Sequence, residues 1–378
     1  MKVLHYYPSA SQTNSLETYL RLLKENGIEL IVLTSCERGD FHRNVEAYGI
    51  PCFAFESGSK NRLVHYWKHI RFLNRFVREH QIDHVFSHLQ QANFVAVLAS
   101  YFHKKPTTLF RHHLTIPGVE RVSKMEKFFD RVIDRLGKQL VVASPSVLQN
   151  IQKYESIRPE KYQVIPYCYD FDKYPKPDPN RVAQIRASYP EGDFIFLMCS
   201  RFVASKRHRY ALDVLEILLT KYQWRIQLLL LDSGPLLDEI KAVISEKKLD
   251  QQVTIVGFTN EFVNYMAASD LLFHPSLTET SSSTVKEMAL LNKPVVVTAG
   301  VGDFDDYIVS GENGWKMELE QPAGDTANML DLILKDPQSM YACGSALGKT
   351  VLAKFGLSSF HLNSYLSLLN KKNDGTSL

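Results

Sequence analysis

Short apolar runs rich in β-branched residues alternate along this chain with longer amphipathic stretches, and the pattern occurs twice. Alternation of this kind predicts an α/β fold, in which helices cover both faces of a doubly wound parallel sheet. In the first half we expect strands at 2–6, 29–34, 83–87, 107–111, 139–143 and 162–165, and helices at 15–25, 62–79, 93–101, 124–136 and 145–154. In the second half we expect strands at 194–199, 227–231, 253–256, 271–274 and 294–298, and helices at 209–221, 236–247, 259–267 and 283–291.

A proline- and aspartate-rich stretch at 174–179 interrupts the alternation and predicts a linker between two domains. We expect one Rossmann-like domain at 1–175, completed by an amphipathic C-terminal helix at 356–369, and a second Rossmann-like domain at 180–355. The polar residues 370–378 are expected to form a disordered tail. Because doubly wound sheets bind ligands at the carboxyl ends of their strands, the sequence predicts a site in the cleft between the domains.

Composition excludes several classes of protein. Hydrophobic residues make up 45% and charged residues 22% of the 378 residues, which excludes a disordered or collagen-like chain. No apolar run reaches the ~20 residues that a membrane-spanning helix needs, and the first residues do not resemble a signal peptide. The five cysteines never occur as Cys-x-x-Cys, which indicates reduced thiols in a cytoplasmic protein and no zinc site.

Charge is divided unevenly between the two halves. Residues 1–180 carry 25 Lys and Arg against 18 Asp and Glu, a net charge of +7, whereas the remaining residues carry 19 against 23, a net charge of −4. A basic half favours an anionic ligand or surface. Since the sequence contains no nucleic-acid-binding motif, we expect no nucleic-acid partner.

The stretch 273–287 contains the most informative group of polar residues. It predicts the end of a strand, a polar turn with Glu279, and a helix that begins within 281–283 and presents Glu287. Backbone N–H groups at a helix start can bind an anion, and carboxylates can accept hydrogen bonds from sugar hydroxyls. On their own, two glutamates at this spacing are more often part of an ordinary capped surface helix.

Two neighbouring features change that interpretation. Arg201 and Lys206 follow the strand at 194–199, where two cations could hold a diphosphate. A glycine-containing turn at 299–306 follows the strand at 294–298. The ordered motifs are Arg201…Lys206, Asp232-Ser-Gly-Pro235, Pro275-Ser-Leu-Thr-Glu279, Glu287-Met-Ala-Leu-Leu-Asn-Lys-Pro-Val-Val296, Gly302…Asp306 and Asn313-Gly314. This set resembles glycosyltransferase family 4, whose retaining enzymes have the GT-B fold, and the resemblance extends from residue 2 to residue 369.

The resemblance implies a GT-B architecture, in which an N-terminal acceptor-binding domain and a C-terminal donor-binding domain face a central cleft. Arg201 and Lys206 would bind the donor diphosphate and stabilise the charge of the leaving nucleotide. Glu279 would bind hydroxyls of the donor sugar, and Glu287 would bind the ribose. The other donor-binding positions that the resemblance implies are Gly257, Phe258, Thr280, Ser281, Ser282, Ser283 and Asp306. A surface ion pair or a helix cap is the alternative at each position.

In the first domain the resemblance implies functional histidines at strand ends. We expect His112, in preference to the adjacent His113, to lie beside the donor sugar and to take part in catalysis. His88, Arg111 and His113 are candidates for the acceptor side, and Arg111 would add positive charge near the phosphates. A purely structural role is an equal alternative for His88.

The loop after the first strand departs from the family pattern because it lacks a glycine pair. Ser11 and Asn14 of this loop remain candidates for donor binding, although a backbone without glycine cannot approach the phosphates as closely. Asn14 and Glu17 are expected to form a capping box at the start of the following helix. Residues 344–350 look like a phosphate loop, but the spacing between their glycines is one residue short and no strand precedes them, so we expect a helix there.

The resemblance therefore implies a retaining, metal-independent hexosyltransferase. It would move a hexose-type sugar from a UDP- or GDP-sugar to a hydroxyl of a glycan or lipid-linked acceptor, in polysaccharide, lipopolysaccharide or glycolipid synthesis. The nucleotide sugar is a co-substrate, and we expect no other cofactor. The alternatives are a GT-B nucleotide-sugar epimerase or phosphorylase, and a catalytically inactive protein that only binds the donor.

The helix expected at 60–78 predicts a contact with a membrane surface. Its basic stripe is Lys68, Arg71, Arg75 and Arg78, with Phe72 and Phe76 alongside, and its buried stripe is Leu63, Trp67, Ile70, Leu73 and Val77. A basic face with aromatic residues can bind anionic lipid headgroups. The sequence thus predicts a cytoplasmic protein that is peripheral on the inner face of the membrane, with an ordinary solvated helix face as the alternative.

Overall fold

The computed structural model describes residues 1–11, 13–112, 123–155 and 157–370. Within them the chain forms two compact units. Unit 1 contains residues 1–112, 123–170 and 355–370, and unit 2 contains residues 171–354. Each unit is built around one parallel sheet, which confirms the predicted α/β fold class.

Unit 1 holds a seven-stranded parallel sheet with the order β3-β2-β1-β4-β5-β6-β7. Its strands are β1 (Lys2–Tyr7), β2 (Glu29–Thr34), β3 (Cys52–Ala54), β4 (His84–His88), β5 (Thr107–Phe110), β6 (Gln139–Val142) and β7 (Tyr162–Val164). The central strand β1 pairs with β2 on one side and β4 on the other, so that Val3 lies between Leu30 and His84. The strand order reverses direction between β1 and β4, and in such sheets ligands bind at this switch point.

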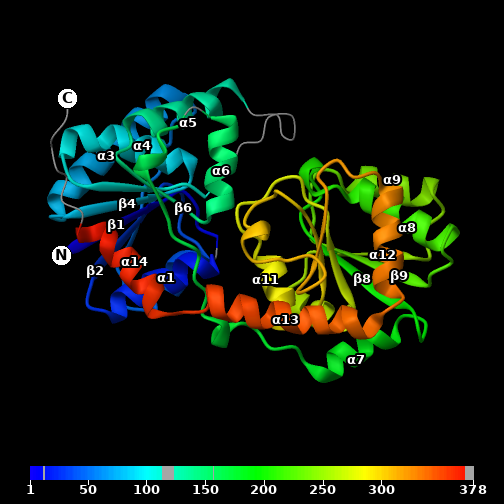
Figure 1. The fold of residues 1–378 in the computed structure, drawn as a ribbon. Coiled ribbons are helices and arrows are strands. Elements are labelled where there is room, and N and C mark those ends of the chain that lie inside the picture. Colours follow the sequence, from blue (N-terminus) through cyan, green and yellow to red (C-terminus); the bar gives the residue numbers. More distant parts are fainter. Residues whose placement is uncertain (12, 113–122, 156, 371–378) are drawn as a thin grey trace. The chain divides into compact units, whose positions relative to one another are not determined.

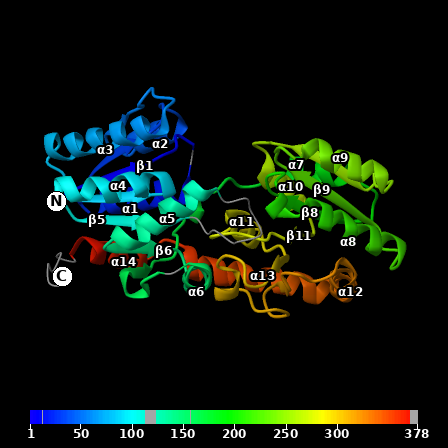
Figure 2. The ribbon, with the colours of Figure 1, turned by 90° about the horizontal axis from the view of Figure 1, so that it is seen from above.

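Helices cover both faces of this sheet because the apolar side chains of each strand alternate between its faces. One face packs on α1 (Asn14–Glu25), α2 (Asp40–Glu46) and α14 (Ser359–Asn370). The other face packs on α3 (Arg62–Glu79), α4 (Gln90–His103) and α5 (Lys124–Leu136), with α4 between its two neighbours (Figures 1 and 2). The remaining elements are α6 (Pro145–Tyr154), which contacts β6 and β7, and the short 3₁₀ helix η1 (Pro159–Lys161).

The C-terminal helix α14 belongs to unit 1, although the whole of unit 2 precedes it in the sequence (red in Figure 1). Tyr365 and Leu368 of this helix are buried in the same core as α1. The ring of Tyr365 lies 3.9 Å from the ring of Tyr19, measured between centroids. The prediction that the C-terminal helix packs on the first domain is therefore confirmed.

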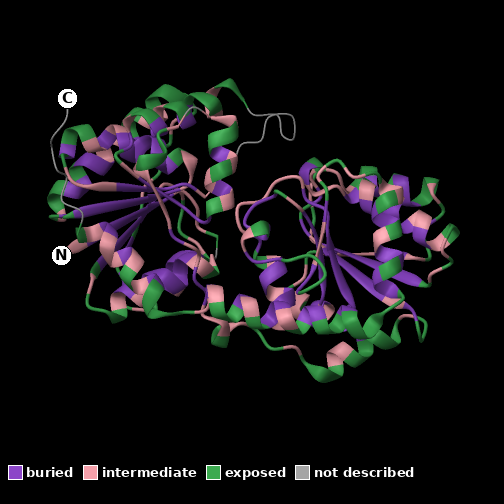
Figure 3. Ribbon diagram, viewed as in Figure 1, coloured by how far each residue is buried: buried purple, intermediate pink, exposed green. Residues whose placement is uncertain are grey.

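Unit 2 holds a six-stranded parallel sheet with the order β10-β9-β8-β11-β12-β13. Its strands are β8 (Phe194–Cys199), β9 (Ile226–Leu231), β10 (Val253–Gly257), β11 (Leu271–His274), β12 (Val295–Thr298) and β13 (Trp315–Met317). One core forms between the sheet and α8 (His208–Thr220), α9 (Leu237–Glu246) and α12 (Ala323–Leu334). Against β8, β11 and β12 lie α10 (Phe262–Ala268) and α11 (Ser283–Leu290). Figure 3 shows that the strands of both units are buried, and that the exposed residues lie mainly on helices and loops.

Several elements were not predicted: β3, β13, α2, α12 and α7 (Pro179–Ala187). The strands among them have three residues each, too few to show a period in the sequence. Of α13 (Pro337–Phe355), only residues 344–350 were predicted to be helical. The prediction that residues 344–350 are helical is confirmed, because they lie within α13. Gly344 is needed there for close packing, since an added Cβ would lie 2.5 Å from the carbonyl oxygen of Asn292. None of the helices in the described part of the chain is long and apolar enough to cross a membrane.

Gly234 fixes the loop that follows β8. The N–H of Phe202 donates to the carbonyl of Ser233 at 3.0 Å, and the N–H of Leu236 donates to the carbonyl of Phe202 at 3.0 Å. An added Cβ at position 234 would lie 2.7 Å from both the backbone nitrogen and the backbone oxygen of Phe202. Only glycine allows this approach between the two loops, and one of them also carries Arg201.

We expect Gly234→Ala to lower the free energy of unfolding by about 1–3 kcal/mol, because backbone has to move to admit the methyl group. Gly324→Ala is the matched control: position 324 is in α12, and no atom lies within 4 Å of an added Cβ. That substitution should stabilise the protein by roughly 0.5–1 kcal/mol. Urea denaturation of both variants checks the expectation, which is wrong if Gly234→Ala unfolds at the wild-type midpoint.

Candidate functional site

In unit 2 the carboxylate of Glu279 lies between two nitrogen groups at the carboxyl ends of β8 and β11. Lys206, the last residue of the 3₁₀ helix η3 (Ala204–Lys206), forms an ion pair with Oε1 of Glu279. His274, the last residue of β11, places Nε2 2.7 Å from the same oxygen. Burial alone would raise the pKa of Glu279, but the hydrogen bond to His274 and the charge of Lys206 lower it to about 2. Glu279 is therefore ionised at neutral pH.

Arg201 lies in the loop between β8 and η3, and its side chain is exposed. Among the residues that the structure describes, it has no ion-pair partner. Its guanidinium group is thus available to a ligand, whereas the charge of Lys206 is already shared with Glu279. The loop that follows β8 consequently carries both predicted cations, and of the two only Lys206 is paired with a carboxylate of the described residues.

Glu287 lies on α11 near the end of β8. Burial raises the pKa of Glu287 to about 7, although the neighbouring charge of Lys286 acts in the opposite direction. Within the described residues its carboxylate accepts no hydrogen bond and forms no ion pair. A partly exposed carboxylate without a partner is a suitable acceptor for the hydroxyls of a ligand.

The other residues predicted to bind the donor occupy the ends of neighbouring elements. Gly257 ends β10 with a φ of +80°, and the next residue, Phe258, is 75% exposed. The turn with Thr280 and Ser281 leads to Ser282, whose hydroxyl accepts a hydrogen bond from the Val285 N–H at 3.5 Å as the N-cap of α11. Ser283 is the exposed first residue of α11, and Asp306 ends the 3₁₀ helix η4 (Phe304–Asp306). Their proposed contacts with a donor stay predictions.

In unit 1 a chain of hydrogen-bonded histidines runs from the core to a cavity of about 160 Å³ beside β4, β5 and β6. Nδ1 of His5 lies 3.2 Å from Nε2 of His88, and Nδ1 of His88 lies 3.0 Å from Nε2 of His112. Nδ1 of His112 lies 2.5 Å from the hydroxyl of Tyr167. Both ring nitrogens of His112 therefore have polar partners, and a sugar hydroxyl would have to replace one of them to bind the ring.

The structure corrects the prediction for His88. Its side chain is only 1% exposed, and each ring nitrogen lies within hydrogen-bond distance of another histidine. Burial, reinforced by the two neighbouring histidines, holds the pKa of His88 well below its usual range. His88 thus supports His112 from within the core, which is the structural alternative stated for it, and its ring also lines the cavity beside β4, β5 and β6.

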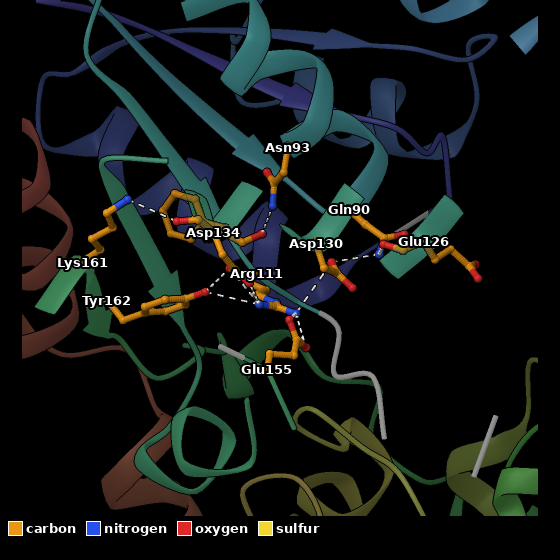
Figure 4. Close-up of polar contacts among 10 residues, drawn as sticks. Gln90, Asn93, Arg111, Glu126, Asp130, Asp134, Glu155, Lys161 and Tyr162 are labelled. Carbon is orange, nitrogen blue, oxygen red and sulfur yellow. Dashed lines mark hydrogen bonds and ion pairs between the residues drawn. The ribbon is translucent and has the colours of Figure 1, made fainter. Parts of the chain in front are cut away.

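Arg111 is a second correction, shown in Figure 4. Its guanidinium group is fully buried and donates to both carboxylate oxygens of Glu155, at 2.6 and 2.7 Å. It also donates to Asp134 at 3.0 Å and lies 3.7 Å from Asp130. Three carboxylates thus surround one cation, so Arg111 adds no positive charge for phosphates. Instead it joins β5 to α5 and to the end of α6.

The first loop of unit 1 differs from its prediction in one detail. The N-cap of α1 is Thr13, whose backbone N–H donates to Oε1 of Glu17 at 3.0 Å, so the capping interaction begins one residue before Asn14. Ser11 is exposed, and its N–H donates to the hydroxyl of Ser9 at 3.1 Å. Asn14 is the first residue of the helix. His113, the other candidate on this side, lies outside the described residues.

Two residues that the sequence analysis did not single out contribute to the site in unit 2. They are His274, which contacts Glu279, and Lys286, which pairs with Asp303. The described residues contain no group of three or more His, Cys, Asp or Glu side chains arranged to hold a metal ion.

Comparison with protein families agrees with this geometry. The family model described as "Glycosyltransferase Family 4" matches residues 12–173, and the model described as "Glycosyl transferases group 1" matches residues 183–347. The chain belongs to the group 1 glycosyltransferases. This group 1 glycosyltransferase also has the GT-B fold: the structure of HepE from Anabaena, solved with UDP, superposes with a TM-score of 0.80 at 20% identity, covering 98% of this chain and all of that one.

Two bacterial glycosyltransferases are similar in sequence. An N-acetylgalactosamine-N,N'-diacetylbacillosaminyl-diphospho-undecaprenol 4-alpha-N-acetylgalactosaminyltransferase from Campylobacter jejuni is 25% identical over 244 residues, which are 63% of this chain and 64% of that protein. The capsular polysaccharide biosynthesis glycosyltransferase CapH from Staphylococcus aureus is 20% identical over 294 residues, which are 73% of this chain and 75% of that one. The match thus spans just under two thirds of the length of the Campylobacter relative.

We expect Arg111→Met to lower the free energy of unfolding by roughly 3–5 kcal/mol at pH 8, because three buried carboxylates lose their cation. The pKa of Glu155 is already raised to about 7 by burial, against the opposing effect of Arg111, and removal of the guanidinium raises it further. Carboxylates with a raised pKa become neutral as the pH falls, so the deficit of the variant should shrink towards pH 5. Denaturation at both pH values measures the difference in unfolding free energy between the variant and the wild type.

Arg75→Met is the control for this experiment. Arg75 forms an exposed ion pair with Glu79 at 3.5 Å on α3, so its loss should change stability by no more than about 0.5 kcal/mol at either pH. Equal effects of the two substitutions would contradict the structural role assigned to Arg111.

Proposed function

We propose that this protein is a retaining hexosyltransferase, which moves a hexose-type sugar from a UDP- or GDP-sugar to a hydroxyl of a glycan or lipid-linked acceptor. The observation that carries the proposal is the ionised Glu279 beside Lys206, with Arg201 unpaired on the same loop. The relatives support the choice of substrates. The Campylobacter protein is named for transfer to a diphospho-undecaprenol-linked sugar, CapH for capsular polysaccharide synthesis, and the Anabaena structure contains UDP.

In this proposal the reaction depends on charge stabilisation and positioning, without a protein nucleophile. Arg201 and Lys206 hold the donor diphosphate and stabilise the negative charge that it gains as the bond between C1 of the sugar and the phosphate oxygen breaks. Glu279 accepts hydrogen bonds from sugar hydroxyls and Glu287 from the ribose. The acceptor hydroxyl attacks C1 on the face that the nucleotide leaves, and its proton passes to the leaving diphosphate. Since side-chain cations supply the positive charge, we propose that transfer is metal-independent.

The test is the release of nucleoside diphosphate from a panel of UDP-, GDP- and ADP-sugars, with and without lipid-linked acceptors in detergent. We expect release from one donor, and a loss of roughly 100-fold or more in kcat for Lys206→Ala and Glu279→Ala. EDTA in the assay should leave the rate unchanged. Transfer with retention is checked by the anomeric configuration of the product.

Lys335→Ala is the matched control. Lys335, the exposed C-cap of α12, forms a 2.7 Å ion pair with Asp331, and neither residue belongs to the proposed site, so the variant should release nucleotide at the wild-type rate. A donor that binds but is never cleaved would favour the inactive donor-binding alternative. Turnover of the donor sugar without any acceptor would favour the epimerase.

The structure changes the description of the proposed membrane contact on α3. The inward positions of this helix are Tyr66, His69, Leu73 and Val77: Tyr66 packs on Phe129, and His69 lies 3.3 Å from the hydroxyl of Tyr6. Leu63 and Trp67, predicted to be buried, are instead 83% and 55% exposed. The predicted buried stripe is confirmed at Leu73 and Val77 and wrong at Leu63 and Trp67. Phe76, which was predicted to lie beside the basic stripe, is instead buried.

An exposed apolar patch therefore accompanies the basic residues. On α3 it consists of Leu63, Val64 and Trp67, and on α5 of Phe128, which is 54% exposed. The two helix starts are adjacent, since Arg62 donates to the sulfur of Met125 at 3.6 Å. The guanidinium of Arg71 lies over the ring of Trp67 at 4.6 Å. We propose that this apolar and basic patch binds an anionic membrane surface on the cytoplasmic side, where a lipid-linked acceptor would be found.

Sedimentation with phosphatidylglycerol vesicles tests this contact. We expect the protein to bind these vesicles more tightly than neutral vesicles, and Leu63→Ala to weaken binding by about tenfold or more, because a buried leucine contributes about 1.5–3 kcal/mol. Leu332→Ala on α12, where the leucine is 69% exposed, is the control and should leave binding unchanged. Equal binding to neutral and anionic vesicles would overturn the proposal.

A further inference from the structure

Lys286 lies inside unit 2 without any exposure to solvent, one residue before Glu287 on α11. Its Nζ donates to Oδ2 of Asp303 at 3.0 Å, to the hydroxyl of Ser281 at 2.8 Å and to the carbonyl of Ser282 at 3.3 Å. The Ser281 hydroxyl in turn donates to the same Asp303 oxygen at 2.6 Å. One ammonium group therefore ties together the turn before α11 and the loop after β12.

These two segments also contact each other directly at Gly302 and Glu279. Gly302 has a φ of +58°, and an added Cβ there would lie 2.9 Å from the Cβ of Glu279 and 3.2 Å from its carbonyl oxygen. The backbone at Gly302 thus packs directly against Glu279. The next residue, Asp303, is the one that pairs with Lys286. Lys286 consequently fixes both the loop at Gly302, which packs against Glu279, and the turn that follows Glu279 in the sequence.

The free energy of folding does not explain why an ion pair is buried at this position. Desolvation of two charges offsets most of their attraction, so such pairs contribute little net stability compared with apolar side chains of similar volume. The pair also adds no net charge to the site, because Asp303 neutralises Lys286. One carboxylate oxygen, Oδ1 of Asp303, even lacks a hydrogen-bond partner among the described residues. What the pair provides is a fixed geometry for the backbone around it.

We propose that Lys286 and Asp303 are positioning residues for the donor: they hold Glu279 and the N–H groups of the turn 280–283 in the arrangement that binds the nucleotide sugar. This inference rests on the proposed function of the site and adds to it the reason for a lysine in the interior. Lys286 does not contact the donor itself. Its effect should appear in donor affinity and KM, with a smaller change in kcat, because the cations Arg201 and Lys206 remain in place.

The test replaces the ion pair by apolar side chains in the double variant Lys286→Met/Asp303→Leu. Lys286→Met alone leaves a buried carboxylate unpaired and should lower the melting temperature, whereas the double variant should regain most of it. We expect the double variant to bind UDP-glucose or GDP-mannose, whichever the wild type binds, at least tenfold more weakly by calorimetry. Lys335→Met, which removes the exposed partner of Asp331 outside the proposed site, is the control and should bind as the wild type does. A stable double variant with wild-type affinity would overturn the proposal.

Hydrogen exchange without any donor separates this inference from the proposed function. If the pair fixes the geometry, amides in the segments 279–283 and 299–306 should exchange at least tenfold faster in the double variant, with β8 and β9 unchanged. Should the wild type bind no sugar nucleotide, the proposed function fails, and faster exchange confined to these two segments still supports the positioning role. Unchanged exchange in both segments overturns it.

Discussion

The contact between Lys206 and Glu279 determines most of what the second unit can do. It joins the loop after β8 to the turn after β11, two segments that are more than 70 residues apart in the sequence and that meet because their strands are neighbours. Because its pKa is lowered, the carboxylate of Glu279 stays charged at all physiological pH values, so the ion pair does not depend on pH in that range.

The parallel sheet makes this convergence inevitable. All strands of a doubly wound sheet end at the same edge, so residues that follow separate strands meet there whatever their separation in the sequence. His274 at the end of β11 and Cys199 at the end of β8 show the same effect in unit 2, and His88 at the end of β4 shows it in unit 1. The chemical nature of the side chains that meet at this edge determines whether they bind a ligand or bond to one another. In unit 1, histidines at this edge form a chain of hydrogen bonds.

The sequence allowed the α/β class and most of the long elements to be predicted, because apolar periodicity depends only on neighbouring residues. It failed where a polar residue takes an inward position. Tyr66 and His69 on α3 are inward because they find partners in Phe129 and Tyr6, and that shifts the exposed stripe. Arg111 and Lys286 are buried for the same reason: each has a carboxylate partner from a distant segment. Pairings of this kind have no local signature, whereas the positions of Glu279 and Lys206 could be inferred from ordered motifs.

The placement of α14 has a consequence for the order in which the protein can be made. Unit 1 contains the N-terminal residues, yet part of its core is supplied by Tyr365 and Leu368, which follow the whole of unit 2 in the sequence. Unit 2 ends at residue 354, so its entire sequence is available before the first unit has its final helix. During synthesis the second unit can therefore complete its core first, while the surface of α1 around Tyr19 remains uncovered until α14 has been made.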